Sequence, residues 1–108
     1  MKKLAGTKRA PRYRTRRVVA VDVDGTIMRA GAGCSQTIAR LRQLHAGGFE
    51  MFLWSARGAE YARAVAARLQ VTDLFTQFVT KPGYILDDEG WRWIRFTKRL
   101  TVEGGQET

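Results

Sequence analysis

The stretch VVAVDVDGT, residues 18–26, places two aspartates inside an apolar run and then turns at Gly25 and Thr26. Its valines are β-branched, and a near-continuous apolar run is typical of a strand that is buried on both faces. We therefore expect a central strand of a parallel sheet. Carboxylates in such a strand cost free energy unless they bind something. Asp22 and Asp24 consequently predict a functional site where this strand ends.

The segment after this strand predicts a loop and then a helix. Residues 25–34 are rich in glycine, and residues 36–45 carry an apolar stripe typical of a helix, formed by Ile38, Leu41 and Leu44. Ser35 is the expected N-cap, because its hydroxyl can accept a hydrogen bond from a free backbone N–H group. Gly47 and Gly48 are expected to end the helix.

The rest of the chain predicts strands that alternate with a helix. The expected strands are residues 49–55, 74–80 and 84–88, and the expected helix is near residues 59–69. That helix has an inner stripe, which we assign to the core: Tyr61, Val65 and Leu69. Strands interleaved with helices indicate an α/β fold with right-handed crossovers, here a minimal Rossmann-like three-layer fold with a short parallel sheet. The segment after Gly90 permits either a strand or a helix.

The positive charge of the chain is concentrated at its N-terminus. The formal net charge is +9, and residues 1–17 carry eight Lys or Arg and no acidic residue. The remaining residues hold 11 basic and 10 acidic side chains, so they are close to neutral. We therefore expect a basic flexible arm at residues 1–17, an α/β domain at residues 18–100 and a flexible tail at residues 101–108. The arm could bind a phosphate backbone through counterion release, or it could act as a solubilising tail.

The cysteine content and the hydropathy of the chain indicate in which cellular compartment it is expected. The single cysteine, Cys34, excludes an intramolecular disulfide and fits a reducing, cytoplasmic compartment. No apolar run approaches the roughly 20 residues that span a bilayer, so a membrane is not an expected partner. The Arg-rich start also resembles an organelle transit peptide, an alternative that lacks a visible amphipathic helical pattern. The sequence leaves the oligomeric state open.

Polar side chains follow the ends of the predicted strands, where open α/β sheets bind ligands. They are Asp22, Asp24, Ser55, Lys81, Asp87 and Asp88. Four converging carboxylates would repel one another unless a cation lay between them, and a hard divalent ion such as Mg²⁺ takes oxygen ligands. Lys81 and Ser55 are donors that suit phosphoryl oxygens. This set favours phosphoryl transfer, in which one carboxylate attacks phosphorus and another protonates the leaving oxygen.

These residues resemble the four motifs of the haloacid dehalogenase superfamily, in its phosphatase branch. DVDGT, residues 22–26, is similar to the first motif, Asp-x-Asp-x-Thr, and Ser55 is similar to the Ser or Thr of the second. Lys81 in TKPG resembles the lysine of the third motif, and YILDD, residues 84–88, resembles the acidic fourth motif. The resemblance covers roughly residues 18–90, with the motifs in the order of the family.

The resemblance implies a role for each of these residues. Asp22 is the nucleophile that forms an aspartyl-phosphate, and Asp24 is the general acid and then the general base. The implied Mg²⁺ ligands are Asp22, the backbone carbonyl of Asp24 and, from the fourth motif, Asp87. Asp88 is either a further ligand or a residue that contacts one. The implied phosphate-binding residues are Ser55, Lys81 and Gly25, the last by letting the backbone turn tightly beside the phosphate. Arg57 could also bind the substrate phosphate, or it could cap the following helix.

The spacing of the motifs predicts an open site. The intervals from Gly25 to Ser55 and from Ser55 to Lys81 each hold one helix and one strand, which leaves no space for the cap domain that many relatives insert. Lys81 and Asp87 are also close in sequence, so a full helix does not fit between them. A capless site can accept a phosphate on a large molecule, or another subunit can cover it. With the basic arm, this favours a nucleotide or a polynucleotide end as the substrate.

Two function classes compete with a phosphatase. Trp91 and Trp93, interleaved with Arg92 and Arg95, could stack on nucleic-acid bases, although we favour a position at the edge of the core. The first competing class is a nucleic-acid-binding protein that uses the phosphatase-like fold only as a scaffold. A regulatory or partner-binding module is the other class, and the complete motif set argues against it.

Overall fold

The structure is a computed structural model, and it describes residues 14–103 and 106–107. Most of the expected basic arm, residues 1–13, lies outside the described residues, as do residues 104, 105 and 108 of the expected tail. Arg17, the last residue of the expected arm, lies over the Phe49 ring at 4.2 Å, and its carbonyl accepts a hydrogen bond from the Glu50 N–H group (2.9 Å). The described part of the arm is therefore in contact with the α/β domain.

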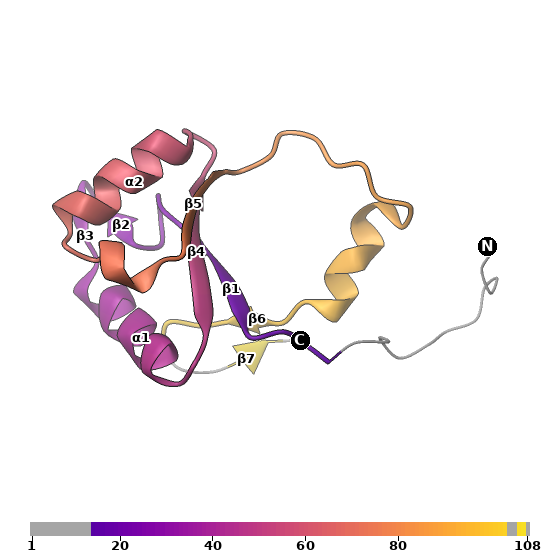
Figure 1. The fold of residues 1–108 in the computed structure, drawn as a ribbon, viewed down its shortest axis with the longest axis horizontal. Coiled ribbons are helices and arrows are strands. Elements are labelled where there is room, and N and C mark those ends of the chain that lie inside the picture. The colour runs from indigo at the N-terminus through magenta and orange to yellow at the C-terminus, as the bar shows by residue number, and fades with distance from the viewer. Residues whose placement is uncertain (1–13, 104–105, 108) are drawn as a thin grey trace.

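A three-stranded parallel sheet forms the centre of the fold (Figure 1). Its strands are β1 (Val18–Asp22), β4 (Glu50–Ser55) and β5 (Gln77–Thr80), in the order β1-β4-β5. The register pairs Asp22 with Trp54 and Ser55 with Thr80. The prediction of a short parallel α/β sheet is confirmed, and the carboxyl ends of its three strands lie at one edge.

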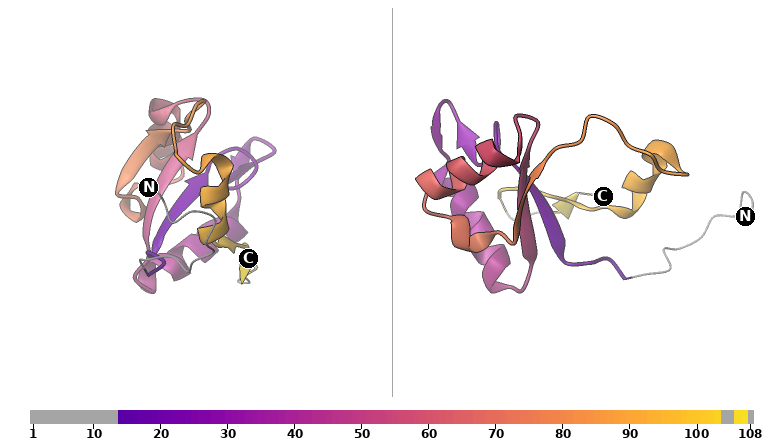
Figure 2. Two further views of the ribbon diagram at one scale, coloured as in Figure 1. Left: turned by 90° about the vertical axis from the view of Figure 1, so that its right-hand side faces the viewer. Right: turned by 45° about the horizontal axis from the view of Figure 1, so that its top comes forward.

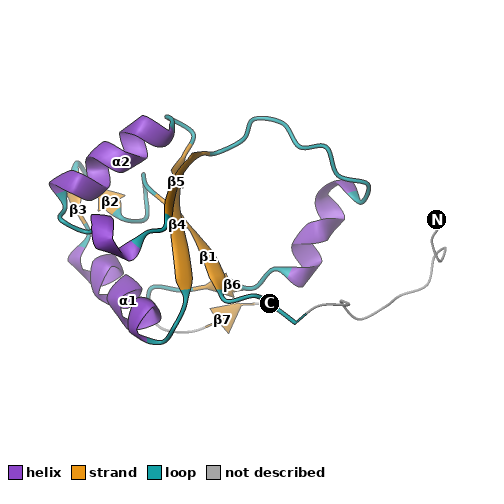
Figure 3. Ribbon diagram, viewed as in Figure 1, coloured by secondary structure: helices purple, strands orange, loops and turns teal. Residues whose placement is uncertain are grey.

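Two helices cover one face of this sheet (Figure 3). They are α1 (Ser35–Ala46), between β1 and β4, and α2 (Ala59–Arg68), between β4 and β5; a 3-10 turn, η1 (Thr72–Leu74), follows α2. Both crossovers step to the next strand in the same direction, and crossovers of one hand then place both helices on the same face. The prediction of a three-layer fold is therefore wrong for the described residues, in which the sheet and the two helices form two layers.

The core lies between this face and the two helices. Side chains alternate along β4, so that Met51, Leu53 and Ser55 are buried toward the helices while Phe52 and Trp54 stay half-buried on the open face. The Phe52 and Trp54 rings pack edge to face there, with centroids 5.5 Å apart.

β1 does not have the central position that its composition predicts. Val21 is buried, whereas Val18 is 45% exposed and Ala20 is exposed on the open face. Among the described residues β1 is an edge strand, and the prediction that both of its faces are buried is wrong. The reason is that the expected fourth strand does not form, so nothing pairs with the second edge of β1 in the described chain.

The connection from β1 to α1 contains a small hairpin where a loop was expected. Its strands are β2 (Met28–Arg29) and β3 (Ala32–Gly33), joined by Ala30 and Gly31, both with positive φ. The N-cap of α1 is Cys34 and not Ser35, because the Cys34 carbonyl already accepts the first helical hydrogen bond, from the Ile38 N–H group (3.0 Å).

The chain after β5 differs most from the expectation (Figure 2). Residues 84–88 form no strand, and the Tyr84 and Leu86 side chains are 95% and 104% exposed. Pro82 and Gly83 interrupt the chain, and the Asp87 carboxylate accepts a hydrogen bond from the Glu89 N–H group (2.8 Å), which closes a local turn in place of strand pairing.

The C-terminal segment contains a 3-10 helix and a short hairpin. The helix is η2 (Gly90–Phe96), and β6 (Arg99–Leu100) pairs with β7 (Gln106–Glu107). Trp91 and Trp93 are 69% and 39% exposed, so the prediction that they close the edge of the core is wrong. No helix among the described residues has the length and apolar character needed to cross a membrane.

Candidate active site

The two aspartates of the first motif lie at the carboxyl end of β1. Asp22 ends the strand, and Asp24 follows the fully buried Val23. Because side chains alternate along an extended chain, burial of Val23 turns both carboxylates away from the core. Their side chains are 38% and 50% exposed, so both carboxylates are open to solvent and to a ligand.

A tight turn after Asp24 returns the chain to the sheet edge. The Gly25 N–H group donates to the Met28 carbonyl (2.8 Å), and the Met28 N–H group donates to the Val23 carbonyl (2.9 Å). Gly25 has φ +87°, and a Cβ added there would meet nothing within 4 Å. Glycine is therefore required by the backbone conformation and not by lack of space.

Lys81 reaches Asp22 from the end of β5. Its Nζ lies 3.8 Å from Asp22 Oδ1 and 5.6 Å from the centre of the Trp54 ring. Its backbone N–H group donates to the Ser55 carbonyl (2.9 Å), which holds the start of the exit segment against β4. The structure thus brings together the residues of the first and third motifs that sequence reasoning assigned to one site.

Ser55 lies between them and is almost fully buried. Ser55 is 2% exposed, and its Oγ accepts a hydrogen bond from the Arg57 N–H group (3.0 Å). Its carbonyl also accepts a hydrogen bond from the Gly58 N–H group (3.0 Å). A hydroxyl that accepts one hydrogen bond still has its own proton to donate. Ser55 therefore shapes the loop after β4 and retains a donor at the sheet edge.

Arg57 and Tyr61 join Asp24 in a network that sequence reasoning missed. The Tyr61 hydroxyl donates to Asp24 Oδ1 (2.9 Å) and accepts a hydrogen bond from Arg57 Nη1 (2.9 Å). The Arg57 guanidinium stacks over the Tyr61 ring at 3.9 Å, and its Nη1 lies 3.7 Å from Asp24 Oδ2. The helical stripe predicts Tyr61 in the core, whereas Tyr61 is only partly buried against the core and its hydroxyl belongs to this network.

The signal for this network is weak in the sequence. Arg57 and Tyr61 are four positions apart at the start of α2, a spacing that often brings side chains together. Contact with Asp24 depends on the crossover that packs α2 against β4 and β5, and no local pattern predicts it. The hydrogen bond to Asp24 and burial raise the pKa of the Tyr61 hydroxyl, while the Arg57 charge opposes this shift.

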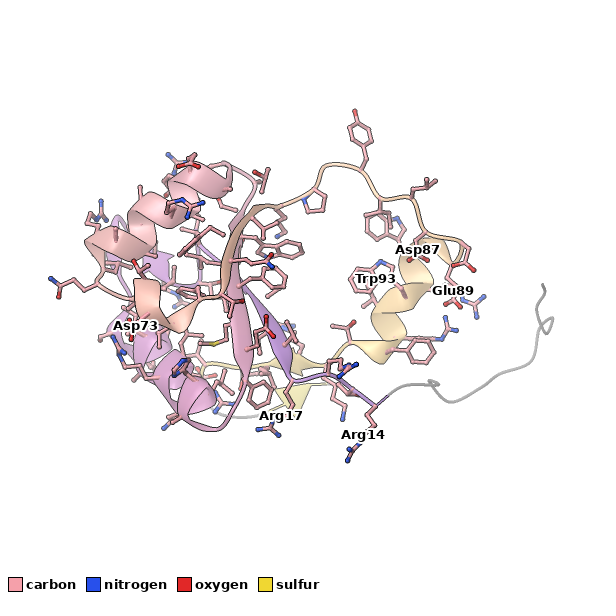
Figure 4. All side chains as sticks on the ribbon, viewed as in Figure 1. Arg14, Arg17, Asp73, Asp87, Glu89 and Trp93 are labelled. Carbon is pink, nitrogen blue, oxygen red and sulfur yellow. The ribbon has the colours of Figure 1, made fainter. Side chains whose placement is uncertain are left out.

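The carboxylates of the fourth motif do not join the site in this structure. Figure 4 shows Asp87 on the segment that leaves β5, away from the sheet. In residues 14–103 and 106–107, no group of three or more His, Cys, Asp or Glu side chains is arranged to hold a metal ion. Asp22 and Asp24 supply carboxylate oxygens, the donors that Mg²⁺ prefers, and Mg²⁺ usually keeps several waters beside one or two carboxylates. The first-motif pair therefore fits Mg²⁺ chemistry, whereas Asp87 and Asp88 lie elsewhere.

The arrangement at the sheet edge joins an acidic pair to cationic and hydroxyl donors. Such a set can bind an anion beside two carboxylates, one of which attacks while the other handles a proton. Comparisons of the chain with protein-family models, with curated proteins and with solved structures find no significant match. The chemistry of this site is therefore what points to a function.

Proposed function

We propose that the chain is a Mg²⁺-dependent phosphomonoester hydrolase of the haloacid dehalogenase type. The observation that carries the proposal is the contact of Lys81 Nζ with Asp22 Oδ1 (3.8 Å), at the edge of the sheet where the strands that end at Asp22 and Ser55 are neighbours. Two carboxylates beside a lysine and a hydroxyl donor are the groups that an aspartyl-phosphate mechanism needs.

In the first step, a carboxylate oxygen of Asp22 attacks phosphorus and the bond from phosphorus to the leaving oxygen breaks. Asp24, protonated at this stage, gives its proton to the leaving oxygen, which departs as an alcohol. The Lys81 ammonium and the Ser55 hydroxyl stabilise the negative charge on the phosphoryl oxygens.

In the second step, water attacks the phosphorus of the aspartyl-phosphate. The Asp24 carboxylate accepts a proton from that water, and the bond from phosphorus to Asp22 breaks. Inorganic phosphate leaves, and both aspartates return to their initial protonation states. Asp24 therefore acts once as an acid and once as a base in each turnover.

Mg²⁺ would be held by the Asp22 carboxylate and the Asp24 backbone carbonyl. When bound, it supplies positive charge that offsets the charge of the phosphoryl group. Asp87 and Asp88 are proposed as additional ligands, which requires residues 81–90 to fold back toward β1. Such a rearrangement is compatible with the edge of β1 that pairs with no strand in the described residues, and with the exposed apolar side chains of residues 84–86.

The proposed substrate is a nucleotide or a polynucleotide end. The aspartates and Lys81 are between one-third and one-half exposed, so a phosphate on a bulky molecule can reach them. Eight Lys or Arg among residues 1–17 would attract a polyanion.

The test is phosphate release with and without Mg²⁺, comparing the wild type with Asp22→Asn. The substrates are an aryl phosphate, a nucleotide panel and an end-phosphorylated oligonucleotide. We expect Mg²⁺-dependent release that Asp22→Asn lowers by at least about a thousandfold, because the variant lacks the nucleophile. Equal release by both proteins, or none by a folded wild type, contradicts the proposal.

A second candidate function is nucleic-acid binding on an inactive scaffold. The exposure of Trp91 and Trp93 favours it, because exposed aromatic rings beside Arg92 and Arg95 can stack on unpaired bases. Binding of a single-stranded oligonucleotide that weakens with salt and on removal of residues 1–17, without any phosphate release, would support this candidate over the first.

A further inference from the structure

Tyr61 contacts the proposed acid–base residue through a hydrogen bond whose direction is fixed by chemistry. A guanidinium can only donate, so the 2.9 Å contact between Arg57 Nη1 and the Tyr61 oxygen makes that oxygen the acceptor. The Tyr61 proton is then directed to Asp24 Oδ1, 2.9 Å away. Of the two carboxylate oxygens of Asp24, Oδ1 is therefore already used as an acceptor.

The position of the Tyr61 ring is itself determined by its surroundings. The ring packs partly against the core from the first turn of α2, and the Arg57 guanidinium stacks on it at 3.9 Å. The Ala59 N–H group donates to Thr80 Oγ1 (2.9 Å), which ties the start of α2 to the end of β5. The Asp24 side chain is half exposed, and its Oδ2 lies 3.7 Å from Arg57 Nη1, so the hydrogen bond from Tyr61 to Oδ1 is the shorter of the two contacts that orient its carboxyl group.

We propose that Tyr61 is a positioning residue, which keeps Asp24 Oδ1 as an acceptor so that Oδ2 is the oxygen that carries and transfers the proton. This inference rests on the proposed function. When Asp24 is the acid, its proton is on Oδ2 and goes to the leaving oxygen. When Asp24 is the base, Oδ2 receives the proton of the attacking water. In both steps the Tyr61 hydroxyl keeps its own proton.

The test uses Tyr61→Phe, which removes one oxygen and retains the ring that Arg57 stacks on. The matched control is Thr76→Val, which removes a hydroxyl that donates to the Glu50 carboxylate (3.1 Å) just before β5, at the end of the sheet opposite to Asp22 and Asp24. Each protein is assayed on an alkyl phosphate, whose leaving oxygen needs a proton, and on a nitrophenyl phosphate, whose leaving oxygen does not. The ratio kcat/KM reports the step that forms the aspartyl-phosphate.

We expect Tyr61→Phe to lower kcat/KM for the alkyl phosphate by about ten- to a hundredfold, through kcat and not KM, because general acid catalysis contributes about 10²–10⁴. For the nitrophenyl phosphate, kcat/KM should fall by at most about threefold, because nitrophenolate leaves with little help from a general acid. In an Asp24→Asn background, adding Tyr61→Phe should change neither ratio further, since Tyr61 acts through Asp24.

Equal losses on the two substrates, or a loss that persists in the Asp24→Asn background, would overturn the role of Tyr61. So would a Tyr61→Phe protein that behaves like Thr76→Val. Wild-type turnover in the same assay separates these outcomes from failure of the proposed function, because a folded wild type without turnover overturns both.

Discussion

At the scale of single residues, alternation along an extended chain accounts for the first motif. Val23 enters the core, so Asp22 and Asp24 on either side of it face outward at the strand end. This arrangement was predictable because it depends on neighbouring residues. The contact of Tyr61 with Asp24 was not predictable, because it joins residues from different elements and depends on where α2 lies against the sheet.

A titration of Tyr61 tests this contact without any activity. Its pKa is raised above 10.0, first because its proton is donated to Asp24 and then because of burial. In the difference between ultraviolet titrations of the wild type and Tyr61→Phe, the phenolate should therefore appear with a midpoint above 10.0. The hydrogen bond stabilises the fold below that midpoint and is lost as the pH rises through it. A midpoint at or below 10.0 contradicts the contact.

At the scale of elements, the regular strands and helices were predictable and the irregular segments were not. β1, β4, β5, α1 and α2 follow from apolar periodicity and from glycines at their ends. The β2–β3 hairpin was missed because its strands are only two residues each. The fourth strand was wrongly predicted because YILDD has strand composition, but composition does not provide a partner strand.

The turn at Gly25 gives a prediction with an internal control. Gly25 and Gly48 both have positive φ, +87° and +91°, and a Cβ would meet nothing within 4 Å at either position. Each Gly→Ala variant should lose about 1–2 kcal/mol of unfolding free energy from backbone strain alone. Only Gly25→Ala should also lower phosphatase activity, because only Gly25 lies beside the proposed phosphate site. Equal activity of the two variants in matched assays contradicts a role for this turn.

The segment after β5 gives a prediction about Mg²⁺. If Asp87 or Asp88 becomes a ligand when residues 81–90 approach β1, its change to Asn should raise the Mg²⁺ concentration for half-maximal activity by about tenfold or more. Asp73→Asn is the charge-matched control, since Asp73 is exposed and pairs with Arg42 at 3.7 Å. An unchanged Mg²⁺ requirement in both Asp87→Asn and Asp88→Asn would leave Asp22 and Asp24 as the ligands and exclude the rearrangement.

At the scale of the whole molecule, the sheet is covered on one face in the described residues. The core between that face and the helices includes Leu53, whereas Trp91 is 69% exposed on η2. Trp91→Ala should therefore change the free energy of unfolding by no more than about 0.5 kcal/mol. Leu53→Ala should lower it by about 2–5 kcal/mol, as for other large-to-small changes in a core. Denaturant titration measures both, and a loss in Trp91→Ala comparable to that in Leu53→Ala contradicts this arrangement.

In the proposed reaction Asp22 becomes covalently phosphorylated, and trapping that intermediate is the sharpest test of the proposal. Asp24→Asn protein is mixed with Mg²⁺ and nitrophenyl phosphate, which needs no acid for the first step, and the variant lacks the base for the second. Borohydride then reduces an aspartyl-phosphate to homoserine, which peptide mass spectrometry locates. We expect homoserine at position 22, and none when Asp22→Asn is added. Nitrophenol release with an unmodified Asp22, or with the modification at another residue, would contradict it.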